Sequence, residues 1–173
     1  MVRAQYTYCQ GVVLGLEVEL AVRTGDPRHA ERVHRLVAAV KDHMLDDGVI
    51  RGAGGGDGGL FGAILARYLT LVATTLPGDT EDDDAARATA RELVLKSAQS
   101  AWDYRQSVNG IPLFGAFWDR AAELPNTGET AKSVDGAVNS SDIAERDLSV
   151  QVAGWMLMEA AHALTAETET EAA

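Results

Sequence analysis

The feature that most constrains the fold of this chain is an alternation between two kinds of helix-forming segment. Residues 27–44 and 83–106 carry apolar side chains on one face and charged side chains on the rest. Residues 10–23, 60–76 and 143–166 are apolar on most sides, and such helices must be buried on most sides. A layer of buried helices wrapped by one-faced helices is the pattern of an α/α barrel or toroid. We therefore predict an all-α fold with about five main helices, alternating inner and outer.

The segments between these helices indicate their boundaries. Asp26 can cap the second helix, with Pro27 at its first position. Residues 46–59 and 107–141 are predicted loops, and no persistent alternation of apolar and polar residues predicts a substantial sheet. We expect one domain over residues 1–166, the C-terminal half of a barrel-like domain, followed by a frayed tail at 167–173.

Charge and composition exclude several classes of partner. The net charge is −11, and binding of nucleic acid or an anionic membrane needs clustered Lys and Arg. The sequence has no uninterrupted run of about 18 apolar residues, so no membrane span is predicted. Cys9 is the single cysteine, so no intrachain disulfide can form. With no leader-like segment at its start, the chain as given is expected to be cytoplasmic, or secreted if the true N-terminus lies upstream.

Conspicuous side chains cluster before the inner helices. Inner helices of such a barrel run parallel, so their N-terminal ends open on one rim. Residues 6–11, 56–61 and 139–142 lead into these helices, and an aromatic loop at 114–119 precedes the third. Aromatic rings stack on sugar faces, while carboxylates and amides hydrogen-bond hydroxyl groups. The candidate substrate-binding residues are Tyr8, Gln10, Asp57, Phe61, Phe117, Trp118 and Asn139.

Each candidate also has a purely structural interpretation. Asp57 and Asp142 can be helix caps, and Tyr8 and Phe61 can belong to the core. Trp118, beside a glycine in a loop, is harder to explain as core. The glycine run at 52–59 lacks the Lys-Ser/Thr of a phosphate loop, and no cofactor is expected.

The histidines do not suggest a metal site. Their spacing does not match a metal-binding motif, so no metal is predicted. His29 and His34 are expected on the solvated face of the second helix.

Five separated segments resemble glycoside hydrolase family 76. They are Tyr-Thr-Tyr-Cys-Gln-Gly from residue 6 with 16–26, Asp-Gly-Gly-Leu-Phe from residue 57 with 64–69, Ser-Ala-Trp at 100–102, the Phe and Trp elements at 114–118, and Asn-Ser-Ser at 139–141. The resemblance implies an (α/α)6 barrel, here partial. It also implies cleavage of α-1,6-linked mannan by two adjacent aspartates, with a mannose-containing oligosaccharide or polysaccharide as partner.

The chain departs from this family at functionally important places. The family's aspartate pair lies upstream of the Tyr-Thr-Tyr segment, and only five residues precede that segment here. Cys9 replaces an Asn, and Gly62 replaces the usual Lys. No catalytic residue is therefore assigned, and the isolated chain is expected to be inactive as an enzyme.

Three functional interpretations stay open. The first is a fragment of an α-mannanase-like glycosidase; the alternative is a non-catalytic carbohydrate-binding or helical interaction protein derived from the same barrel. A sugar epimerase or unsaturated-uronide hydrolase would need rim histidines that are not seen. Half a barrel leaves its inner helices with an uncovered apolar flank, which predicts self-association or a missing N-terminal half.

Overall fold

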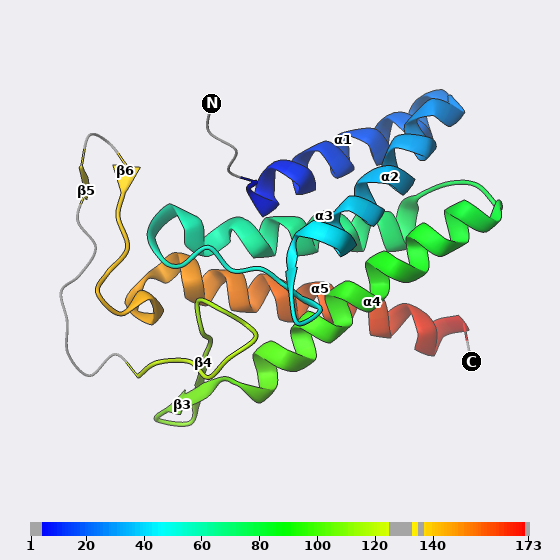
Figure 1. The fold of residues 1–173 in the computed structure, drawn as a ribbon. Coiled ribbons are helices and arrows are strands. Elements are labelled where there is room, and N and C mark those ends of the chain that lie inside the picture. The colour runs from blue at the N-terminus through cyan, green and yellow to red at the C-terminus, as the bar shows by residue number, and fades with distance from the viewer. Residues whose placement is uncertain (1–4, 125–132, 135–136, 172–173) are drawn as a thin grey trace.

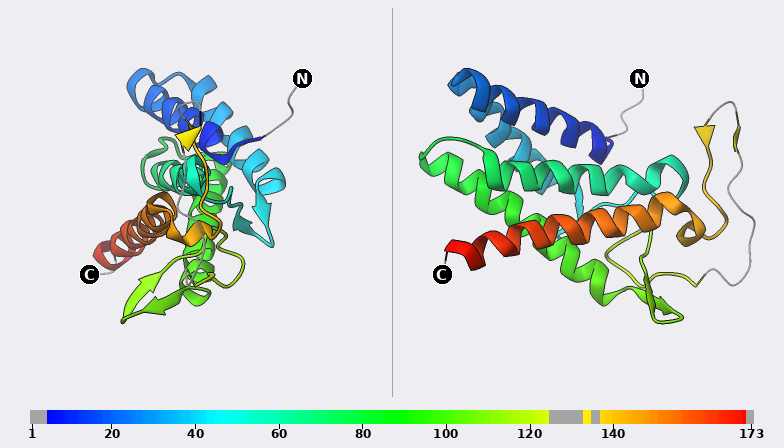
Figure 2. Two further views of the ribbon diagram at one scale, coloured as in Figure 1. Left: turned by 90° about the vertical axis from the view of Figure 1, so that its left-hand side faces the viewer. Right: turned by 180° about the vertical axis from the view of Figure 1, so that it is seen from behind.

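The computed structural model describes residues 5–124, 133–134 and 137–171 (Figure 1). Within this part of the chain there are five α-helices: α1 (Thr7–Thr24), α2 (Pro27–His43), α3 (Phe61–Thr75), α4 (Glu81–Asp103) and α5 (Leu148–Glu171). Helices α1, α3 and α5 lie side by side in one row and begin at the same end, while α2 and α4 pack behind them (Figure 2). The all-α fold, with inner and outer helices alternating, is confirmed.

Helix α3 is the centre of the structure. It packs against α1 and α5 within the row and against α4 behind it. Residues Gly56–Thr75 have the length and mean hydropathy, 1.3, of a membrane-spanning helix. In this fold the neighbouring helices bury Leu65, Leu69 and Val72 completely, so one face of α3 is apolar because it belongs to the core.

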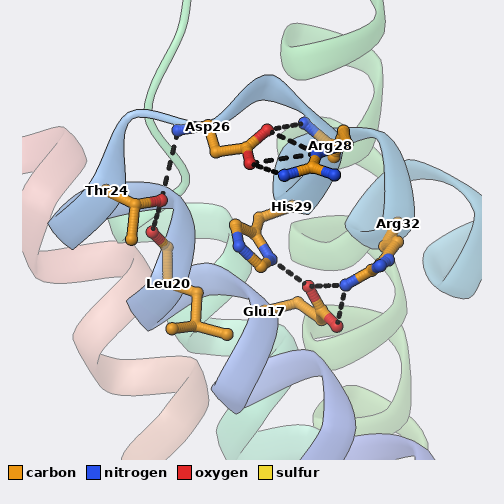
Figure 3. A network of polar contacts seen from close by, with 7 residues as sticks. All are labelled: Glu17, Leu20, Thr24, Asp26, Arg28, His29 and Arg32. Carbon is orange, nitrogen blue, oxygen red and sulfur yellow. Dashed lines mark hydrogen bonds and ion pairs between the residues drawn. The ribbon is translucent and has the colours of Figure 1, made fainter.

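The turn from α1 to α2 follows the sequence signals closely (Figure 3). Gly25 takes the left-handed conformation that ends α1, with φ 65°. The Asp26 side chain then accepts a hydrogen bond from the backbone N–H of Arg28 at 3.0 Å and pairs with its guanidinium. The hydrogen bonds from Arg28 lower the pKa of Asp26 to about 2. The predicted cap with Pro27 at the first helical position is confirmed.

The prediction that His29 and His34 lie on a solvated face is wrong. His29 Nδ1 lies 2.6 Å from the Glu17 carboxylate of α1, to which Arg32 also donates at 3.1 Å (Figure 3). His34 Nε2 lies 2.8 Å from Asp83 of α4. Both histidines therefore connect the outer helix α2 to its neighbours, a role that spacing along one helix does not reveal.

Three antiparallel hairpins interrupt the expected loops. They pair β1 (Leu45–Asp46) with β2 (Val49–Ile50), β3 (Gln106–Val108) with β4 (Ile111–Leu113), and β5 (Ser133–Val134) with β6 (Ala137–Val138). No substantial sheet was predicted, and each of these ladders pairs only two strands of two or three residues. Short 3-10 helices, η1 (Gly56–Leu60) and η2 (Ala144–Arg146), precede α3 and α5.

The third inner helix differs from its predicted bounds. It starts at Leu148 rather than near residue 143, because η2 comes first. It continues to Glu171, so residues 167–171, expected in a frayed tail, are helical. Residues 172–173 of that tail lie outside the described residues.

The face of the row opposite α2 and α4 is open. Val12 and Leu16 of α1 and Val152 and Trp155 of α5 are exposed, and Trp155 is 58% exposed. A groove of about 630 Å³ runs between α1 and α3, and one of about 370 Å³ between α3 and α5. Helices α1 and α5 are thus apolar all round but covered on only part of their circumference.

Candidate functional site

Aromatic side chains meet where α1 and α3 begin. The Tyr8 and Phe61 ring centroids are 4.4 Å apart, and Tyr6 lies 5.9 Å from Tyr8 and 5.6 Å from Phe61. Tyr8 and Phe61 are half-buried, while Tyr6 is exposed. A side-chain hydrogen bond with Cys9 raises the pKa of Tyr8 above its ordinary value. The structure therefore brings two predicted site residues together and leaves ring surface open at the rim.

Asp57 projects from the loop that enters α3. It lies in η1 and is exposed. The N-cap position of α3 is occupied by Leu60, and no side chain caps either η1 or α3, so Asp57 is not the cap of this helix. Strand β6 lies against η1, and exposed Asn139 follows β6 directly. Asp57 and Asn139 are thus carried by neighbouring segments of the rim, and Gln10 is half-buried in the first turn of α1.

The aromatic loop divides into a buried and a half-buried part. Trp118 is 5% exposed and belongs to the core, where a Cβ on Gly62 would lie 3.3 Å from its ring. The interpretation that Trp118 is not a core residue is wrong; Ser100 Oγ also fixes it by donating to its carbonyl at 2.7 Å. Phe117 is half-buried and its ring lies against Gly52. The Arg120 guanidinium carbon lies 4.5 Å from the centroid of the Phe117 ring.

The sequence analysis missed the carboxylate that joins these segments, Asp147. Asp147 is 7% exposed and accepts hydrogen bonds from the backbone N–H groups of Gly56, at 2.7 Å, and Ser141, at 3.1 Å. The Ser141 hydroxyl donates to it as well. Burial raises the pKa of Asp147, but the hydrogen bonds from Ser141 and Gly56 outweigh that effect and hold it below its ordinary value. An aspartate immediately before an apolar helical run was the available signal.

A second polar anchor holds the aromatic loop. The Gln151 side chain accepts from the Phe114 N–H at 3.0 Å and donates to the Phe114 carbonyl at 2.9 Å. Buried Glu145 accepts from the Ala116 N–H at 3.3 Å. The start of α5 therefore holds both the glycine loop and the aromatic loop in place.

The rim is an open surface rather than a closed pocket. The space between the glycine loop and Trp118 has a volume of only about 10 Å³, room for at most one water. The groups at the rim, half-buried aromatic rings with an exposed carboxylate and an exposed amide, suit stacking and hydroxyl recognition. Among the residues the structure describes, no three His, Cys, Asp or Glu side chains gather as a metal site.

A row of parallel inner helices backed by outer helices, with sugar-compatible groups at their N-terminal ends, defines the wall of an α/α-barrel glycosidase. The chain belongs to glycosyl hydrolase family 76, whose model matches residues 1–152. No curated protein matches the sequence significantly.

Several solved structures share this fold. The GH76A α-1,6-mannanase from Salegentibacter sp. HEL1_6 is 27% identical, with a TM-score of 0.70 over 94% of this chain. An inactive variant of it, with two adjacent aspartates replaced by alanine, was solved with α-1,6-mannotetrose and is 28% identical over 93% of this chain, also at 0.70. The Lin0763 protein from Listeria innocua is 25% identical over 94%, with a TM-score of 0.66. This chain spans 41%, 40% and 38% of those chains.

Proposed function

We propose that these 173 residues form the sugar-contacting part of an enzyme that hydrolyses α-1,6-linked mannan. The observation that carries the proposal is the meeting of Tyr8 and Phe61 at the rim of a family 76 chain, next to the loop that carries Asp57. Tyr8, Gln10, Asp57, Phe61, Phe117 and Asn139 would contact mannose units. Trp118 would not contact the sugar directly; its buried ring would support the glycine loop from the core side.

The hydrolytic carboxylates would come from outside these residues. Glycoside hydrolysis needs one protonated carboxyl for the leaving oxygen and one ionised carboxylate at the anomeric carbon. The adjacent aspartates of this sequence do not suit those roles: Asp46 is paired with Arg51 beside α2, and Asp83 is buried against His34 at the start of α4. Asp147 is at the rim, but its oxygens are already occupied by three donors.

The open face suggests where the rest of such an enzyme would pack. Related mannanase chains are more than twice as long as the part matched here, and a barrel closes with further inner helices. Arg67, exposed in the middle of α3, lines both grooves, and no ion pair joins it to another residue in the described part of the chain. A carboxylate on a facing helix would form an ion pair with the Arg67 guanidinium. Without that half, we expect self-association through the same face.

Binding of the tetrasaccharide α-1,6-mannotetrose to this chain tests the proposal. Isothermal titration should show saturable binding, with maltotetraose, which differs in sugar and linkage, as the ligand control. Asp57→Asn and Phe61→Ala should each weaken binding, whereas Asp42→Asn, an exposed change on α2, should not. Absence of binding, or equal binding of both sugars, would refute the proposal.

The alternative function is that of a non-catalytic carbohydrate-binding protein, and measurements of mannan hydrolysis distinguish it from a part of an enzyme. The observation that favours it is that no free pair of carboxylates faces the rim in the described residues. No turnover of α-1,6-mannan is expected from this chain, since proton transfer alone contributes about 10²–10⁴-fold to such reactions. A longer protein carrying an aspartate pair should hydrolyse mannan if the first function is correct, and should bind without hydrolysis if the second is.

A further inference from the structure

The buried carboxylate of Asp147 lies at the point where three segments of the rim converge. It receives hydrogen bonds from Gly56 of the glycine loop and from Ser141 of the segment that carries Asn139, and it stands next to the first residue of α5. Ser149, two residues further along the chain, donates to the Gly56 carbonyl at 2.6 Å. Gly56 is therefore held through both its N–H and its carbonyl.

The glycine loop packs closely against this carboxylate and its neighbours. A Cβ on Gly55 would lie 2.2 Å from Asp147 Oδ2 and 2.5 Å from the Ser140 hydroxyl. A Cβ on Gly59 would lie 2.4 Å from the Ser149 hydroxyl. The loop thus lies directly on these side chains, and Asp57 is exposed on the same loop.

We propose that Asp147 is a positioning residue of the sugar site, fixing the loop of Asp57 and Phe61 against the segment of Asn139. This inference rests on the proposed function for the identity of the ligand. Asp147 does not contact the sugar itself, because its oxygens accept from Gly56 and Ser141. It acts through the geometry of exposed residues on two other segments.

The chemistry of the contact explains why a carboxylate is needed. The N–H groups of Gly56 and Ser141 and the Ser141 hydroxyl all donate, so an acceptor-only group satisfies each of them. In Asp147→Asn one oxygen is replaced by an NH₂ donor, which then faces at least one donor. Hydrogen bonds to charged groups are strong and costly to lose when buried.

Hydrogen exchange and sugar binding, measured on the 173-residue chain, test the inference together. In Asp147→Asn, amide exchange in residues 52–60 and 139–146 should rise about 10- to 100-fold, as expected for loss of charge-assisted bonds. Exchange in residues 86–98 of α4 should not change, and affinity for α-1,6-mannotetrose should fall about tenfold. Ser141→Ala, which removes one donor and no charge, should produce a smaller rise in the same segments. Asp42→Asn is the matched control.

Each result decides the inference. Exchange that rises equally in α4 and the loops would show general destabilisation and would overturn the positioning role, as would unchanged sugar affinity in Asp147→Asn. If Asp147→Asn does not fold, Ser141→Ala decides: unchanged exchange in both loop segments would overturn the inference. If the unaltered chain does not bind the sugar, the proposed function fails, and the role of Asp147 in the site fails with it. The exchange data then still decide whether Asp147 fixes the loops.

Discussion

Helix α1 approaches α3 through two glycines on one face, Gly11 and Gly15. A Cβ on Gly11 would lie 2.9 Å from the Leu65 Cα and 3.0 Å from the Ile64 carbonyl oxygen. Both are backbone atoms, so Gly11→Ala can be accommodated only if α1 moves away from α3. A Cβ on Gly15 would lie 2.3 Å from the Tyr68 ring, but Tyr68 lines the open groove and can turn into it.

The two alanine variants therefore form a matched pair. Each gains about 1 kcal/mol from replacing a helical glycine, so this gain cancels in their difference. Overpacking against an immobile neighbour lowers the free energy of unfolding by about 1–3 kcal/mol. This cost applies to Gly11→Ala alone. Gly11→Ala should thus be about 1–3 kcal/mol less stable than Gly15→Ala. Each kcal/mol corresponds to about 2–4 °C in Tm for chains of this length.

Thermal unfolding followed by circular dichroism measures this difference. Equal midpoints, or a lower midpoint for Gly15→Ala, would show that the backbone contact between α1 and α3 does not limit packing. The same displacement should separate Tyr8 from Phe61, since these residues begin the two helices. Near-ultraviolet circular dichroism of Gly11→Ala should change accordingly, and that of Gly15→Ala should change less.

Three further predictions concern stability and association. Hydrogen bonds from His29 and Arg32 hold the pKa of Glu17 below its ordinary value despite burial, and those from Thr80 and His34 do the same for Asp83. Their contribution is therefore complete above about pH 5 and is lost as pH falls through the lowered folded-state pKa. Glu17→Gln should reduce the slope of Tm against pH below 5, whereas exposed Glu92→Gln should not. Trp118→Ala should cost about 3–5 kcal/mol in chemical denaturation, because the ring is buried; a cost below 1 kcal/mol would contradict that position. Light scattering should show self-association that Trp155→Ser reduces, and a stable monomer that binds no hydrophobic dye would exclude it.

The helices were predictable because their signals are local. The apolar stripe of α2, with Val33, Val37 and Val40 buried, repeats at helical spacing. Two of the hairpins also had local signals that the strand pattern did not show. Asp47-Gly48 and Asn109-Gly110 occupy two-residue turns with positive φ, 52° and 81° in the first and 52° and 80° in the second. Asp-Gly and Asn-Gly favour such turns, so dipeptides predict these hairpins better than alternation over strands of two or three residues.

The uncovered flank was expected from the resemblance to half of a barrel, whereas the composition of a helix reports the burial it needs and not what this chain supplies. Helix α1 is apolar on most sides, which indicates burial all round, yet Val12 and Leu16 remain exposed. The outer helices and α3 cover only the other side. An all-round apolar helix at the end of a row therefore indicates a further neighbour, and the sequence of the helix itself does not identify that neighbour.

The aspartates that precede the inner helices show why the roles of the site residues could not be predicted from sequence. Asp57, Asp142 and Asp147 all precede inner helices, and each could be interpreted as a cap or a ligand. Their roles depend on which donors reach them: Asp147 meets Gly56, 91 residues earlier, whereas Asp57 on the same loop stays exposed. Local propensity treats such aspartates alike, since the distinguishing donors come from segments far apart in sequence. The donors that converge on Asp147 leave it buried, whereas Asp57 stays exposed, and this difference is why the proposals above assign positioning to the first and ligand contact to the second.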